Sequence, residues 1–195
     1  MANLITLQEY KDAENLTVNR DDYRIDYLIE SVSQLVKTYC GNSIVDYYTI
    51  SKVEILNINW DTHLVQLTES PLVSVSSVEE RVSYSSSYIL LSEADNDYFV
   101  DTTLDTIYRT TGTGYRSWRK GPGAVRVTYN AGYADTPKDL KLAIIDLVTY
   151  YLKDEYKERK TLAGASMQNP GTSSQDSSVA FPDHIKRVLD LYKNF

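Results

Sequence analysis

The chain has 195 residues, a formal net charge of -7 and one cysteine, Cys40. A chain of this length can bury a core without covalent staples, and a single cysteine excludes a disulfide framework or a multi-cysteine metal site within one chain. The acidic balance disfavours sequence-specific DNA binding, because affinity for nucleic acid rests largely on Lys and Arg side chains. The 17 tyrosines, against 3 phenylalanines, suit either protein interfaces or exposed strand faces.

Two helices are predicted at the N-terminus. A capping-box pattern at residues 6–9 predicts a short helix that ends near Asn15. A longer helix is predicted from Asp22 to Tyr39, where apolar residues recur three and four apart, and Gly41 ends it. The segment carries neither the basic start nor the apolar run of a signal peptide, and no stretch approaches the roughly 20 apolar residues of a membrane span. We therefore expect a soluble protein with no membrane contact.

Between residues 44 and 132 the apolar pattern changes from helical spacing to alternation. Short runs rich in β-branched and aromatic residues predict strands separated by polar turns: Ile44–Ile58, His63–Leu67, Leu72–Val82, Tyr88–Leu91, Tyr98–Val100 and Thr106–Arg109. The connections are too short for parallel crossovers. This region is therefore predicted to be an inserted antiparallel β-sheet or small barrel.

The glycine-rich segment GTGYRSWRKGPG, residues 112–123, lies before the last strand. It is not a phosphate-binding loop, because the glycine-lysine-hydroxyl ending is absent and a strand follows it. A hairpin tip that carries Arg116, Trp118, Arg119 and Lys120 is a candidate contact with a partner protein, through insertion of Trp118, or with nucleic acid. The alternative is that Trp118 caps the β core while the charged groups face water.

A strand, a turn and a long helix are predicted next. Apolar and polar residues alternate from Val125 to Tyr129, and Asn130 to Gly132 tolerates the positive φ of a turn. Thr136 is the predicted helix cap, and the helix runs from Pro137 to Glu158, roughly 33 Å at the standard rise per residue. Its apolar stripe needs a partner, which we expect to be the helix from Asp22 to Tyr39.

The C-terminal part is predicted to be a linker and a final helix. Residues 160–180 lack periodicity and are rich in small polar residues, which is typical of a flexible linker. The helix predicted over residues 182–193 has an apolar stripe of Ile185, Val188, Leu189 and Tyr192. A helix on a tether can dock on its own domain or on a neighbour. The expected fold class is α+β, with a helical core (residues 1–43 and 133–195) of two long packed helices plus the terminal helix, and a β insertion (residues 44–132).

No local signature of catalysis, cofactor binding or metal binding is present. His63 and His184 stand alone in sequence, and ordinary structural roles are expected for both. One acidic run consists of Glu93, Asp95, Asp97 and Asp101. It lacks the central glycine and terminal glutamate of the calcium-binding loop, so we expect it to be a solvated hairpin turn. We expect a protein that is not an enzyme and holds no cofactor or metal, with a hydrolase of dispersed site as the least favoured hypothesis.

Four stretches occur in an order that matches one protein family. They are Leu4–Thr6 with YLIESVSQLVKTYCGN at residues 27–42, ESPLVSVSSV at 69–78, VTYNAGY and TPKDLKLAI at 127–133 and 136–144, and Phe181–Pro182 with IKRVLDLYK at 185–193. Together they resemble the head-tail connector proteins (adaptor or head-completion proteins) of tailed bacteriophages. The family's pattern does not extend to residues 83–123 or 160–180.

The resemblance implies a structural protein of the virion neck, made in the host cytoplasm. It implies a homo-oligomeric ring, usually dodecameric, that docks under the portal protein and carries the tail, stopper or tail-terminator protein below. DNA passes through such a ring without sequence-specific binding. The stripe of the terminal helix is then a candidate contact with the portal or the next subunit. The alternative is a tail or neck binding module whose β insertion recognises a partner protein or a glycan.

Overall fold

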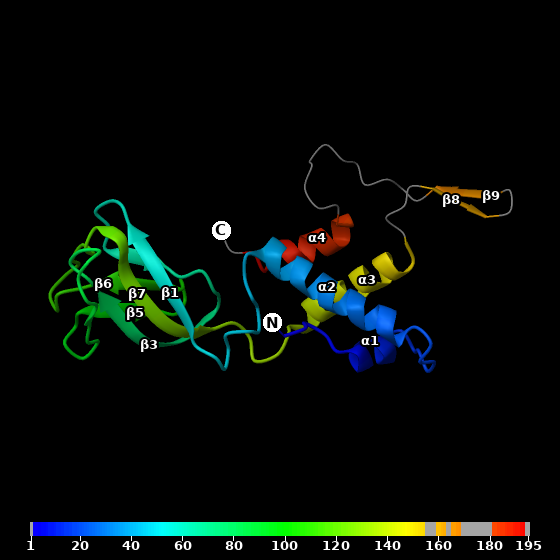
Figure 1. The fold of residues 1–195 in the computed structure, drawn as a ribbon, viewed down its shortest axis with the longest axis horizontal. Helices are drawn as coiled ribbons and strands as arrows, with labels where there is room; N and C mark the ends of the chain where they lie inside the picture. The colour runs from blue at the N-terminus through cyan, green and yellow to red at the C-terminus, as the bar shows by residue number, and fades with distance from the viewer. Residues whose placement is uncertain (1, 155–158, 163–164, 169–180, 194–195) are drawn as a thin grey trace. The chain divides into compact units, whose positions relative to one another are not determined.

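The computed structural model describes residues 2–154, 159–162, 165–168 and 181–193. The chain divides into two compact units, which we call the helical unit (residues 1–41 and 136–193) and the β unit (residues 42–135). Figure 1 shows the helices in the first and the larger sheets in the second. The fold is α+β with antiparallel sheets, which confirms the predicted class.

Four helices are described in the helical unit: α1 Leu7–Ala13, α2 Asp22–Cys40, α3 Lys138–Leu152 and α4 Asp183–Asp190. The capping box predicted for α1 is present, since the Thr6 hydroxyl accepts from the Glu9 N–H (3.1 Å) and the Glu9 carboxylate accepts from the Thr6 N–H (2.8 Å). Gly41 ends α2 in the left-handed conformation, with φ of 65°. Local signals therefore set the start of α1 and the end of α2.

The core of the helical unit is formed by the apolar faces of α2, α3 and α4. Helix α2 contacts α3 and α4, and α3 contacts α4, as Figure 1 shows. The buried side chains on these faces are Ile25, Ile29, Val32, Val36, Leu140, Ile144, Leu147, Val148, Ile185 and Leu189. Their burial from water is the main source of stability for a unit of this kind.

Helix α3 begins later and ends earlier than predicted. Its N-cap is Pro137, and no side chain caps it, so the assignment of Thr136 as the cap is wrong. Pro137 has an extended ψ of 144°, which lies outside the helical region, so the helix begins one residue later, at Lys138. At the other end Asp154 has φ of 56°, a left-handed conformation that stops the helix. Residues 155–158 of the predicted helix lie outside the described residues.

The β unit contains two antiparallel sheets. The four-stranded sheet has the order β1-β7-β3-β4, and the three-stranded sheet has the order β2-β6-β5. The strands are β1 Lys52–Ile58, β2 Leu64–Gln66, β3 Leu72–Glu80, β4 Ile89–Leu90, β5 Tyr98–Asp101, β6 Thr106–Arg109 and β7 Gly121–Ala131. The longest strand, β7, pairs with both β1 and β3. Each predicted strand region therefore contains a strand, although several are shorter than predicted.

The first predicted strand is wrong over residues 44–51, which form turns and bends before β1. Ile44 has φ of 65°, which is incompatible with a strand. The side chain of Asn42 accepts from the Ile44 N–H (2.8 Å) and holds this turn. Ile44 is nevertheless buried, so its apolar character reflects packing and not alternation along a strand.

A buried polar network ties this entry segment to the four-stranded sheet. The Glu69 carboxylate accepts from the Ser43 N–H (2.8 Å) and pairs with the Lys52 ammonium (2.9 Å). The Tyr129 hydroxyl donates to Glu54 (2.5 Å), and burial together with that carboxylate raises the pKa of Tyr129. The polar groups of this network find their hydrogen-bond partners in several segments, so the network favours a single packing of those segments.

Part of the range predicted as a linker forms a hairpin. Strands β8 Arg159–Leu162 and β9 Ala165–Gln168 pair antiparallel in a two-stranded sheet. Residues 169–180 of the predicted linker lie outside the described residues. Across the part of the chain that the structure describes, no helix combines the length and apolar character needed to cross a membrane.

Candidate interaction surface

The stripe on α4 packs inside its own helical unit. Ile185 and Leu189 are buried, and Val188 and Tyr192 are half-buried. The Tyr192 hydroxyl donates to the Asp139 carboxylate on α3 (2.7 Å), which holds the pKa of Asp139 below its usual value. The predicted contact of this stripe with a portal or a neighbouring subunit does not fit these positions, because the stripe completes a core that α2 and α3 leave open.

Trp118 is also buried, with an exposed fraction of 2%. It belongs to the apolar core of the β unit, and the Arg109 guanidinium lies 5.9 Å from its ring centre. Arg116, Arg119 and Lys120 are exposed. The structure therefore supports the alternative in which Trp118 fills the core and the charges face water, and it contradicts insertion of Trp118 into a partner.

The burial of Trp118 follows from how its segment is held. The backbone N–H of Trp118 donates to the Thr62 carbonyl (2.9 Å), and the backbone N–H of Arg119 donates to the Glu80 carboxylate (2.7 Å). Glu80 also pairs with the buried Arg109 guanidinium (3.6 Å). Because a buried charge without a partner is costly, Glu80 stays beside Arg109. The hydrogen bond from the Arg119 backbone N–H to Glu80 then holds the segment against β3. The composition of the segment alone does not reveal these long-range partners.

Aromatic side chains gather instead on the outer face of the three-stranded sheet. Tyr108 on β6 lies directly opposite Leu64 on β2 and Phe99 on β5. Residues paired in this way project from the same face of a sheet. Phe99, at 56% exposed, has no polar group with which to meet water. The face therefore presents an apolar row across all three strands.

Two further rings extend this row. The centre of the His63 ring lies 4.7 Å from that of Tyr115, and Tyr115 lies 5.7 Å from Tyr108. Tyr108 in turn lies 6.4 Å from Phe99. We call these four residues, His63, Phe99, Tyr108 and Tyr115, the aromatic surface. Strand alternation alone could not find it, because its members come from four segments whose register is set by tertiary structure.

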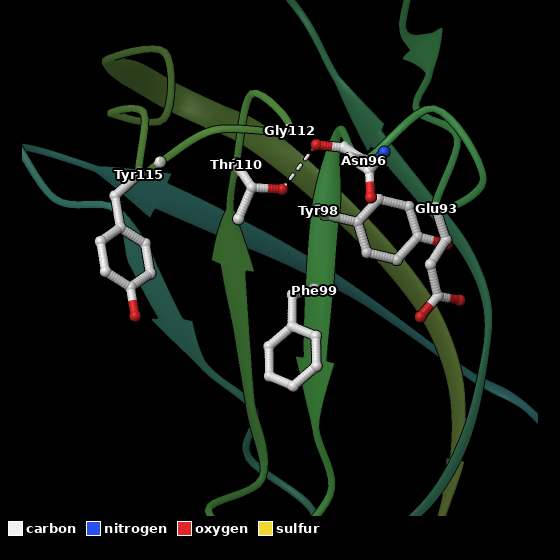
Figure 2. Close-up of a pocket in the computed structure, with 8 residues that line it drawn as sticks. Glu93, Asn96, Tyr98, Phe99, Thr110, Gly112 and Tyr115 are labelled. Atoms are coloured by element: carbon white, nitrogen blue, oxygen red, sulfur yellow. Dashed lines mark hydrogen bonds between the residues drawn. The ribbon is translucent and has the colours of Figure 1, made fainter.

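A pocket of about 350 Å³ adjoins the aromatic surface (Figure 2). Figure 2 shows Thr110 between Tyr115 and Asn96, with Phe99 on the neighbouring strand. The Thr110 hydroxyl donates to the backbone carbonyl of Asn96 (2.6 Å). This bond joins the loop before β5 to the loop after β6, and both loops line the pocket. The lining residues are Glu93, Asn96, Tyr98, Phe99, Thr110, Gly112, Gly114 and Tyr115.

The charge around the pocket is negative. Glu93 and Asp95 are exposed, and neither has a cationic partner among the described residues. The Ser92 N–H and the Arg109 guanidinium hold the pKa of Asp97 below its usual value. Burial, and then the charge of Glu93, raises the pKa of Tyr98. The site thus combines exposed rings with unpaired carboxylates.

The described residues show no centre for metal or thiol chemistry. Among them, no three His, Cys, Asp or Glu side chains are placed to hold a metal ion together. Cys40 is buried, and burial raises the pKa of its thiol to about 11. Such a thiol is protonated at neutral pH and unreactive.

Comparison with known proteins gives a family match over nearly the whole sequence. The model of the head completion protein family matches residues 3–195. The head completion protein of Escherichia phage T5 is 31% identical over 72 residues, which cover 36% of this chain and 39% of that protein. This matched stretch therefore spans about two fifths of the phage T5 relative.

Solved structures share the fold along almost the full length. A chain in the neck of an empty gene transfer agent particle, computed with C6 symmetry, has a TM-score of 0.59 at 13% identity, with 98% of this chain and 90% of that chain covered. A chain in the neck of the native particle, computed with C12 symmetry, has a TM-score of 0.57 at 14% identity, with 100% and 96% covered. At these identities the likeness concerns the fold.

Proposed function

The chain belongs to the head completion protein family, and we propose that it is a structural protein of the virion neck, a ring adaptor between the portal vertex of a phage capsid and the tail or stopper. The family match over residues 3–195 is the observation that carries this proposal. The shared fold with neck chains of gene transfer agent particles supports it. The role is structural and needs no catalytic step.

We assign the adaptor core to residues 1–43 and 133–195 and the insertion to residues 44–132. The two long helices α2 and α3 pack against each other and form the frame of that core. The ring is proposed to be dodecameric, in keeping with the C12 symmetry of one neck structure that shares the fold. The portal above and a tail or stopper protein below are its proposed partners.

A ring requires two different faces of each subunit to meet. The stripe of α4 is buried, so these faces must come from other parts of the surface. Tyr23 and Tyr27, four residues apart on α2, are both exposed and are proposed to form part of one face. The exposed Arg116 and Arg119, rather than Trp118, are proposed as the contact group of the 112–123 segment.

The acidic charge of the chain suits a ring through which DNA slides. A net charge of -7 does not attract phosphate groups, whereas a basic lumen would hold the duplex. The alternative function, a binding module, is favoured by one observation, the aromatic surface of the β unit. The two roles are compatible, because a neck adaptor also has to bind neighbours.

Deletion of the gene from the phage that encodes this chain tests the proposal. Capsids and tails are expected to form but to stay separate, because the joint between them is missing. Electron microscopy of lysates measures this directly, and expression of the chain from a plasmid should restore joined particles. Normal virions in the absence of the chain would contradict the proposed role.

A further inference from the structure

The aromatic surface is exposed and continuous, and nothing among the described residues covers it. Neighbouring rings contact one another in the spatial order His63, Tyr115, Tyr108 and Phe99. Tyr115 is 70% exposed and Phe99 is 56% exposed. Aromatic rings of this kind carry most of the energy of many interfaces, since they bury a large area with few rotatable bonds. The surface is therefore suited to binding.

The lining of the adjoining pocket indicates the charge of the occupant. Glu93 is the only ionised group among its lining residues, and no lysine or arginine lines it. Asp95 adds a second exposed carboxylate close by in the chain. A phosphate, a nucleotide or an acidic peptide would meet repulsion here. A cationic group would be attracted.

The basic residues of the neighbouring segments do not line the pocket. Arg109 is buried and pairs with both Glu80 and Asp97. Arg116 is exposed and is not one of the residues that line the pocket. Among the described residues, neither Glu93 nor Asp95 takes part in an ion pair. Charge complementarity therefore favours a positively charged occupant.

We propose that the aromatic surface and its pocket bind an arginine-bearing segment of a partner protein. A guanidinium stacks on aromatic faces and donates hydrogen bonds without accepting any, which matches rings beside the Glu93 carboxylate. The pocket volume of about 350 Å³ accommodates one such side chain. The rest of the segment lies across Tyr108 and Phe99. This inference does not depend on ring formation.

The proposal is tested on the full chain with the peptide acetyl-Gly-Arg-Gly-amide. Two-dimensional NMR is expected to show saturable shifts for the amides of Asn96, Thr110, Gly112 and Tyr115, with affinity that falls as salt is added. The matched peptide with citrulline, which keeps the shape but not the charge, should bind at least about threefold more weakly. Maltotriose serves as the neutral saccharide probe.

Two substitutions at exposed positions test the assigned groups. Glu93→Gln and Tyr115→Ala should each weaken binding of the arginine peptide by about threefold or more. Asp26→Asn on α2 and Tyr84→Ala, both exposed and outside the pocket lining, are the matched controls and should leave it unchanged. Equal binding of the citrulline peptide, saturation by maltotriose instead, or no saturable shift would overturn the proposal.

Discussion

Replacement of Gly132 by alanine is expected to lower the free energy of unfolding of the β unit by about 2–4 kcal/mol. Gly132 has φ of 96°, in the region that favours glycine. An added Cβ would lie 2.2 Å from the Ile44 carbonyl oxygen. That oxygen belongs to the backbone and accepts from the Tyr133 N–H (2.8 Å), so it cannot rotate away without loss of this bond.

Gly114→Ala is the matched control. Nothing lies within 4 Å of an added Cβ at Gly114, so its cost should stay within about 0.5 kcal/mol. Both tryptophans, Trp60 and Trp118, belong to the β unit, so urea unfolding followed by tryptophan fluorescence reports on this unit. Equal midpoints for the two variants would show that the close approach of Gly132 to Ile44 does not matter for stability.

Leu189→Ala is expected to destabilise the helical unit by about 3–5 kcal/mol. Leu189 is fully buried in α4, which packs on α2 and α3. The substitution removes apolar contacts and leaves a cavity that packed helices fill only in part. Thermal or urea unfolding followed by far-UV circular dichroism measures the loss.

Leu191, two residues further on, provides the control because its side chain is 77% exposed. Leu191→Ala should change stability by no more than about 0.5 kcal/mol. The comparison distinguishes a helix that completes the core of its own unit from a helix that docks on a partner. If Leu189→Ala were as stable as Leu191→Ala, the stripe would not complete the core, and its docking on a portal would again be the better hypothesis.

Local features of the chain could be predicted because their causes are local. The capping box at Thr6 and the left-handed Gly41 act within one turn of helix, so residue type and spacing are sufficient. The segment that begins at Ile44 was wrongly predicted as a strand, because a distant partner decides its conformation. Its β-branched and aromatic residues are typical of a strand, but Ile44 is buried in a turn with positive φ that packs against Gly132.

Features that depend on distant partners could not be predicted. The stripe of α4 indicates that one face is covered, but periodicity does not say whether its own chain or a neighbour covers it. Trp118 was predicted to be a candidate contact with a partner protein. Its burial could not be predicted, because Glu80 and Arg109, the buried ion pair that holds its segment, belong to other strands. His63 stood alone in sequence, yet strand register places it beside Tyr108 and Tyr115.

The most direct test of the neck role is assembly of the purified chain on its portal. The two proteins are mixed, and the product is imaged by electron cryomicroscopy beside the portal alone and the chain alone. We expect an added ring of twelve copies at the tail-facing side of the portal, with a central opening wide enough for duplex DNA. A portal that gains no density, with the chain left as free monomers, would contradict the proposed function.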